Sequence, residues 1–272
     1  MRQDGRLAAE GAPSDMRQAG PSVAPPRRIW ALDLARSLAI LGMALYHFTY
    51  DLALFGFIAP HVPFSFGWIL EARIVATSFL GLAGASLVLA HGQGIRWRQF
   101  LRRFGWLAAA AAAISLFTWF DDPERYVFFG ILHCIATASL IGLLLVRLPG
   151  GLTLALAVAV LAVWLYLPRE GFEARWLLGL GLSREVPRSM DFVPLVPWLA
   201  PFLAGMGITQ LLRAAGRRRA FRADVVAPAR AVTPPSPALR LLAWPGRHSL
   251  AIYVVHQPLL LGLTWAAAQL LR

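Results

Sequence analysis

A histidine and an aspartate lie four residues apart in an otherwise apolar stretch, residues 29–57. His47 and Asp51 would share one face of a helix, where the carboxylate can accept a proton from one ring nitrogen and leave the other nitrogen basic. Ionisable groups at membrane depth cost about 2.5–3.5 kcal/mol each on insertion scales, so they usually face a protein interior and mark function. The pair is predicted either to act as a general base or acyl acceptor, or to form a hydrogen bond that packs two membrane helices.

Two more histidines lie in apolar segments, His133 in FFGILHCIATASL and His256, followed by Gln257, in SLAIYVVHQPLLLGL. A rise of about 1.5 Å per residue places His47 about 12 Å and His133 about 10 Å inside the outer ends of their segments. His47 and His133 are therefore predicted to line one cavity, whereas His256 is predicted to lie nearer the cytoplasm. Because the three histidines share no ligand-type spacing, we expect no metal.

The composition predicts an all-α, polytopic membrane protein. Of 272 residues, 58% are hydrophobic and only 15% are charged, and the mean hydropathy is +0.59. About seven segments approach the roughly 20 apolar residues needed to cross a bilayer core. They are residues 30–55, 72–90, 104–120, 126–146, 152–167, 192–212 and 250–271.

The net charge is +12, and every basic residue is an arginine. In a soluble chain this balance would suggest nucleic acid, but here the arginines concentrate in alternate connections between apolar segments. That bias predicts a cytoplasmic N-terminus, an external C-terminus and no nucleic-acid partner. The single cysteine, Cys134, excludes a disulfide within the chain.

The polar segments suggest one membrane domain, residues 29–272, with two appendages. Residues 1–28 contain no apolar run and are predicted to form a disordered cytoplasmic tail. Residues 213–249 are predicted to be a basic, Pro-rich cytoplasmic loop.

Three local patterns predict how the helices begin and pack. Pro194, Pro197 and Pro201 indicate a broken or re-entrant start to the sixth span, or a helix that begins only near Trp198. Asp33 and Arg36 are three residues apart and are predicted to form an ion pair with each other on one helix. The small residues of GLAGAS, residues 81–86, favour close contact between helices.

Five segments resemble the bacterial DUF1624 proteins, relatives of the catalytic domain of heparan-α-glucosaminide N-acetyltransferase. In the family's order they are LDLARSLAILGMALYHFTYDLALFG, ARIVATSFLGLAGASLVLA, FFGILHCIA, DFVPLVPWLAPFLAG and GRHSLAIYVVHQPLL. The characterised relative moves acetyl from cytosolic acetyl-CoA to the amino group of a glucosamine on the far side of the membrane, and the resemblance implies a membrane acyltransferase here. The relative's D-x-x-R-G opening reads D-L-A-R-S from Asp33 here. Its catalytic histidine lies in the loop region that contains His61 here, at a different spacing.

The resulting hypothesis is transfer of an acyl group, acetyl above all, from cytoplasmic acyl-CoA to a hydroxyl or amine of a sugar or envelope glycan. The predicted catalytic residues are His47, Asp51 and His133, and the predicted substrate-binding residues are Arg73, His256 and Gln257. In this scheme the first histidine, oriented by the aspartate, deprotonates the acceptor or carries the acyl group. His133 and Arg73 would bind the acceptor or stabilise the oxyanion. His256 and Gln257 would contact the thioester end of the donor.

The alternative is a non-catalytic membrane carrier, or a lipid- or solute-binding protein, whose buried histidines relay protons or hold a ligand. Transport proteins usually contain inverted repeats with paired broken helices, whereas this sequence shows one broken segment. The expected partners of the enzyme are membrane lipids, acyl-CoA, a glycan acceptor and a second copy of the chain. The expected location is the bacterial inner membrane.

Overall fold

The computed structural model describes residues 29–167, 172, 174–184, 187–223 and 236–271, and in these ranges the fold is helical. The predicted tail, residues 1–28, and residues 224–235 of the predicted basic loop lie outside the described residues. The α-helices are α1 (Trp30–Leu54), α2 (Phe66–His91), α3 (Trp97–Asp121), α4 (Ile131–Leu145), α5 (Gly150–Tyr166), α6 (Leu195–Ala223), α7 (Pro237–Leu242), α8 (Trp244–Arg247) and α9 (Ser249–Leu271). Two 3₁₀ helices, η1 (Val62–Phe64) and η2 (Arg175–Leu180), lie in connections.

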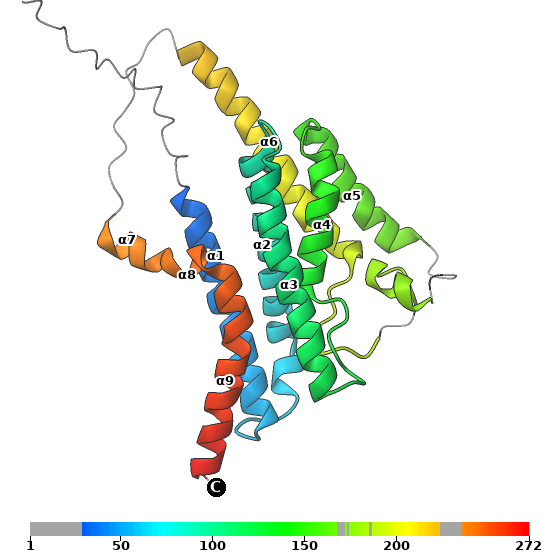
Figure 1. Cartoon of the computed structure of the whole chain (residues 1–272), viewed down its shortest axis with the longest axis vertical. Coiled ribbons are helices and arrows are strands. Elements are labelled where there is room, and N and C mark those ends of the chain that lie inside the picture. The colour runs from blue at the N-terminus through cyan, green and yellow to red at the C-terminus, as the bar shows by residue number, and fades with distance from the viewer. Residues whose placement is uncertain (1–28, 168–171, 173, 185–186, 224–235, 272) are drawn as a thin grey trace, which may run out of the picture.

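Each predicted span corresponds to one helix, α1 to α6 or α9 (Figure 1). Five helices in the described ranges are long and apolar enough to cross a membrane, while α4 and α5 are shorter apolar helices. This confirms an all-α integral membrane protein. Helices α2 and α3 begin six and seven residues before the predicted spans, because hydropathy marks the hydrocarbon core whereas the helix continues into the interface.

The predicted start of the fourth span is wrong by five residues, since α4 begins at Ile131 rather than at residue 126. The preceding segment is held instead by an isolated parallel bridge between Phe129 and Phe192. His133 consequently lies in the first turn of α4, not deep inside a span.

The centre of the bundle is the crossing of α2 and α6, where glycines let two backbones meet. A Cβ atom built on Gly205 would lie 2.0 Å from the carbonyl oxygen of Gly81, and one on Gly84 would lie 2.0 Å from that of Phe202. The predicted small-residue contact is thereby confirmed. The side chains of Phe202, Leu80 and Met206 fill the core around this crossing.

The broken start of α6 is also confirmed. Val196 has non-helical angles, φ −103° and ψ 123°, inside the segment that begins at Leu195, and Pro201 lies within the helix. The regular part of α6 then follows and packs between α2 and α5. This bend carries Leu199 and Phe202 into the core.

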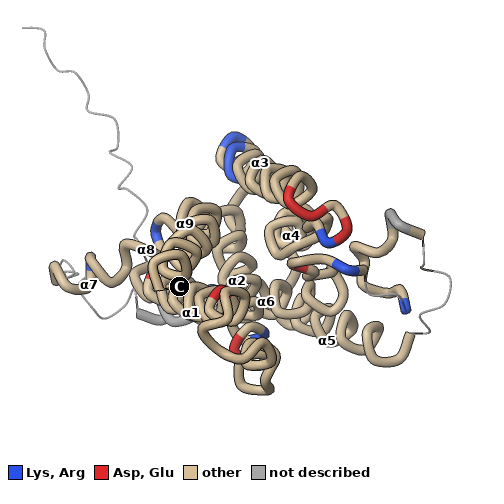
Figure 2. Tube along the Cα trace, turned by 90° about the horizontal axis from the view of Figure 1, so that it is seen from below, with Lys and Arg blue, Asp and Glu red and all other residues tan. Residues whose placement is uncertain are grey.

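Helices α1 and α9, from the two ends of the described chain, run side by side at one flank of the bundle, and the short α7 and α8 lie near the start of α1 (Figure 1). We call the face at which α1, α3 and α9 begin the upper face. Seen from the opposite side, the tube is mostly tan, with few red or blue positions (Figure 2). Charged residues are therefore few in this bundle, and those that lie inside it are candidates for a functional site.

Candidate active site

The rings of His47 on α1 and His256 on α9 lie against each other, with centroids 4.9 Å apart and an edge-to-face angle of 66°. His256 is 9% exposed and His47 is partly buried. The sequence placed these two histidines at different depths, but the register of α1 against α9 brings them together. They form the histidine pair, named so below.

The backbone fixes which nitrogen of His256 is free. Its Nδ1 lies 2.7 Å from the carbonyl oxygen of Tyr253, and because a carbonyl can only accept, Nδ1 must carry the proton. In the neutral ring Nε2 is then a bare acceptor. That atom is buried and has no hydrogen-bond partner among the described residues, so it is free to take a proton from a bound group.

Asp51 does not pair with His47 as the i+4 spacing predicted. Its side chain is 0% exposed and its Oδ1 accepts a hydrogen bond from Nε2 of Gln257, at 3.0 Å. In the part of the chain that the structure describes, no hydrogen bond joins Asp51 to His47. The predicted partner thus lies on α9, one residue beyond His256, rather than on the same helix.

Several buried acceptor atoms near this pair have no donor. Within the described residues, Oδ2 of Asp51, Oε1 of Gln257 and Nε2 of His256 lack a partner, and so does Oε2 of Glu71. Glu71, on α2, lies against Gly42 of α1, where a Cβ atom would come 2.6 Å from its Oε1. A buried acceptor left unpaired costs about 1–3 kcal/mol. The site is therefore suited to a ligand or water molecules that donate hydrogen bonds.

His133, predicted to share a cavity with His47, lies elsewhere. The backbone N–H of Gly130 donates to its Nδ1 at 3.2 Å, so Nε2 carries the proton and donates to Oγ of Ser115, also at 3.2 Å. The hydroxyl of Ser115 in turn donates to the carbonyl oxygen of Val127. Both nitrogens are satisfied, and this arrangement ties the start of α4 to α3.

The start of α4 has a second tie, from Asp191 in the connection before α6. Its Oδ2 accepts a hydrogen bond from the backbone N–H of Ile131 at 3.0 Å, and a Cβ atom on Gly130 would approach that oxygen to 2.3 Å. A carboxylate in this position acts as a helix cap supplied from sixty residues away.

We expect Asp191→Ala to lower the free energy of unfolding by about 1 kcal/mol, the usual cost of losing a cap. The measurement is unfolding of the purified protein in detergent. Asp121→Ala, which alters an exposed carboxylate at the end of α3, is the matched control. Equal effects of the two substitutions would contradict the capping role.

Arg73 and His61 lie apart from the histidine pair. Arg73 is exposed on the second turn of α2, and His61 is exposed at the start of η1. Neither side chain forms a hydrogen bond or ion pair within the described part of the chain.

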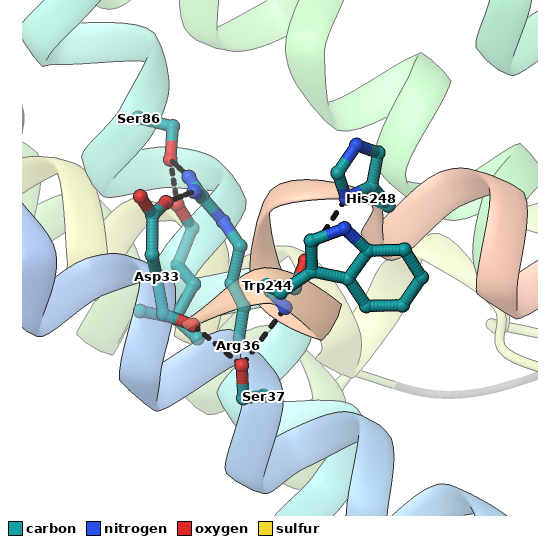
Figure 3. A network of polar contacts seen from close by, with 8 residues as sticks. Asp33, Arg36, Ser37, Ser86, Trp244 and His248 are labelled. Carbon is teal, nitrogen blue, oxygen red and sulfur yellow. Dashed lines mark hydrogen bonds and ion pairs between the residues drawn. The ribbon is translucent and has the colours of Figure 1, made fainter. Parts of the chain in front are cut away.

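A network of polar contacts fastens α8 to α1 and α2 (Figure 3). Arg36 donates to Oδ1 of Asp33 at 3.0 Å and to Oγ of Ser86, which confirms the predicted local pair on α1 and links it to a second helix, α2. The backbone N–H of Gly246 donates to Oγ of Ser37 at 2.8 Å. A Cβ atom on Gly246 would lie 1.8 Å from the carbonyl oxygen of Asp33, so α8 can approach α1 this closely only with glycine at that position.

Beside this network lies a cavity of about 270 Å³ between α1, α2, α3, α4 and α9. Three arginines from three segments line it: Arg36, Arg103 of α3 and Arg247 of α8. In the described ranges no carboxylate pairs with Arg103 or Arg247. The rest of the wall is largely apolar and comprises Phe79, Leu82, Ala83, Leu107, Ile131, Leu132, Ile135 and Leu250.

Tyr253 connects this cavity to the histidine pair. Its side chain lines the cavity, and its ring centroid lies 5.6 Å from that of His256, one turn further along α9. The i, i+3 spacing before His256 is the signal that could have identified Tyr253 in the sequence. Arg103 and Arg247 belong to arginine-rich connections that could bind CoA phosphates, but they were not singled out there because the orientation bias of membrane loops already accounted for their charge.

The described residues contain no group of three or more His, Cys, Asp or Glu side chains placed to bind a metal ion. The polar groups in this region are instead three arginines that line the cavity and unpaired acceptors on α1, α2 and α9 outside its lining. The arginines suit an anionic ligand, and the unpaired acceptors suit a ligand that donates hydrogen bonds.

Comparison with known families places this site in context. The family described as heparan-alpha-glucosaminide N-acetyltransferase, catalytic, matches residues 28–258. No match was found among curated proteins or among solved structures. The matched range contains both histidines of the pair, Tyr253 and the three cavity arginines. The chain therefore belongs to the heparan-alpha-glucosaminide N-acetyltransferase catalytic family.

Proposed function

We propose that the protein transfers an acyl group, acetyl above all, from acyl-CoA to a hydroxyl or amine of a sugar or envelope glycan. One observation carries the proposal. Tyr253 lines the arginine-lined cavity and packs beside His256, whose ring lies against His47. A donor that enters among the arginines can thus extend toward a buried base.

The cavity suits the donor because its two ends differ in chemistry. Arg36, Arg103 and Arg247 offer cationic groups to phosphate oxygens, which guanidinium groups bind with charge-assisted hydrogen bonds. The apolar wall suits a pantetheine arm and its acyl end. The described arginines concentrate at the upper face, so we assign this face to the cytoplasm, where acyl-CoA is available. In a bacterial cell the membrane would be the inner one.

The proposed reaction is direct transfer at the histidine pair. The acceptor oxygen or nitrogen forms a bond to the thioester carbonyl carbon while Nε2 of His256 takes its proton. The carbon–sulfur bond then breaks, and the CoA thiolate receives that proton. His47, which the sequence suggested as the base, holds the ring of His256 at 4.9 Å between centroids and completes the pocket around the reacting group.

The acceptor would approach from the other side of the pair. Oδ2 of Asp51 and Oε1 of Gln257 are buried acceptors without donors in the described chain, and sugar hydroxyl groups or an amine supply donors. Asp51 and Gln257 therefore keep a role in the site, as acceptor-binding groups. The predicted roles of His133 and Arg73 are not part of this proposal, since both side chains lie apart from the pair.

The test of the donor site is binding of acetyl-CoA to purified protein, followed by release of free CoA when glucosamine is added as the probe acceptor. We expect Arg103→Gln to weaken acetyl-CoA binding about tenfold, since a hydrogen bond to a charged group contributes about 1.5–3 kcal/mol. The loss should shrink at high salt.

Arg102→Gln removes a neighbouring exposed arginine that does not line the cavity, and it should leave the dissociation constant within about twofold of wild type. If wild-type protein binds no acetyl-CoA, the transferase proposal fails and the carrier alternative gains. Binding without CoA release from any acceptor would also favour the carrier.

A further inference from the structure

Tyr253 occupies a position between donor cavity and base that no other polar side chain of the described cavity wall shares. The other polar side chains in that wall are those of Arg36, Arg103, Arg247 and Ser249. Arg247, at the end of α8, and Ser249, at the start of α9, precede Tyr253 by one turn or more, whereas His256 follows it. Along the α9 wall, the phenol is therefore the last donor that a thioester meets before the histidine pair.

The hydroxyl of Tyr253 has no hydrogen-bond partner among the described residues, although the ring packs beside His256 and the backbone carbonyl holds Nδ1 of the same histidine. The residue thus contributes its backbone to the orientation of the base, while its side chain lines the cavity.

We propose that Tyr253 is a further catalytic residue, whose hydroxyl donates a hydrogen bond to the thioester oxygen as that oxygen becomes negatively charged. This inference rests on the proposed acyl transfer. As the acceptor attacks, the carbonyl π electrons move onto oxygen and the acceptor proton moves to His256. When the double bond re-forms, the carbon–sulfur bond breaks and the thiolate takes the proton. The phenol keeps its own proton throughout and stabilises only the intermediate charge.

Tyr253→Phe separates this role from a packing role, because phenylalanine keeps the ring beside His256 and removes only the donor. Loss of one oxyanion donor typically lowers kcat by about 10²–10³. We expect kcat for acetyl transfer to glucosamine to fall about 100-fold, while the dissociation constant for acetyl-CoA stays within about twofold, since the donor acts only after the charge develops. The pH profile should keep its shape, because the base is unchanged.

The matched control is Tyr50→Phe, which removes a phenol from α1 that packs on Phe64 outside the cavity. An unchanged kcat in Tyr253→Phe would overturn the proposal, and so would a loss of binding as large as the loss of kcat, which would indicate packing alone. If wild-type protein binds and transfers acetyl and only the Tyr253 result differs, the proposed function stands without this residue. If the wild type does neither, both proposals fail.

Discussion

His256→Ala is expected to lower acetyl transfer by about 10³-fold, within the range that a general base contributes, while acetyl-CoA binding stays within about threefold. The physical reason is the arrangement of the ring. Nδ1 is bound to the carbonyl oxygen of Tyr253 at 2.7 Å, which leaves Nε2 buried and bare. The measurement is the rate of CoA release at saturating acetyl-CoA with glucosamine as acceptor, together with the dissociation constant from direct binding.

Two companion substitutions make the result specific. His47→Ala removes the ring that packs on His256 and should reduce the rate by about 10²-fold, because a misplacement of about 1 Å in a catalytic group can cost that much. His61→Ala, in the exposed loop after α1, should leave the rate near wild type. A large loss in His61→Ala with an active His256→Ala would move the base to the loop and remove the pair from the reaction.

The second large effect concerns stability. Gly205→Val is expected to reduce the free energy of unfolding by about 3 kcal/mol, the upper end for an overpacked core. A Cβ atom there would lie 2.0 Å from the carbonyl oxygen of Gly81 and 2.8 Å from its Cα. Because both obstacles are backbone atoms, no side-chain rotation relieves the overlap, and α6 must move away from α2.

Thermal unfolding in detergent, followed by the fraction of protein that stays monodisperse, measures this effect. The matched control is Gly262→Val on α9, where a Cβ atom would meet nothing within 4 Å. Similar midpoints for the two variants would show that the α2–α6 crossing does not limit stability. Gly205→Ala should fall between wild type and the valine variant.

Much of the fold followed from local pattern. Runs of apolar residues marked the five long helices and the two shorter apolar ones, because a bilayer core demands length and hydrophobicity that few soluble segments possess. The pair formed by Asp33 and Arg36 was predictable because its spacing is a property of a single helix, and the structure holds it at 3.0 Å. The prolines before Trp198 likewise act on their own backbone, and α6 is broken at Val196 as they predicted.

The candidate site followed only in part, because its geometry depends on how separate helices are shifted and rotated. His47 and Asp51 do share a helix face, yet Asp51 bonds Gln257 on α9 instead. The depth of a residue in the membrane was counted from the predicted end of its span, so an error in that end becomes an error in the depth. The start of α4 was misplaced by five residues, and this put His133 in the wrong place.

The sequence by itself determined the class of protein, the helices, the local ion pair and the short set of ionisable residues that a membrane interior makes costly. Only the tertiary structure decided which of them meet. The register of α1 against α9 joins His47 to His256, and the approach of α8 to α1 at Gly246 brings Arg247 to the cavity wall near Arg36. These contacts join residues about two hundred positions apart, and no periodicity within one helix encodes its rotation against another.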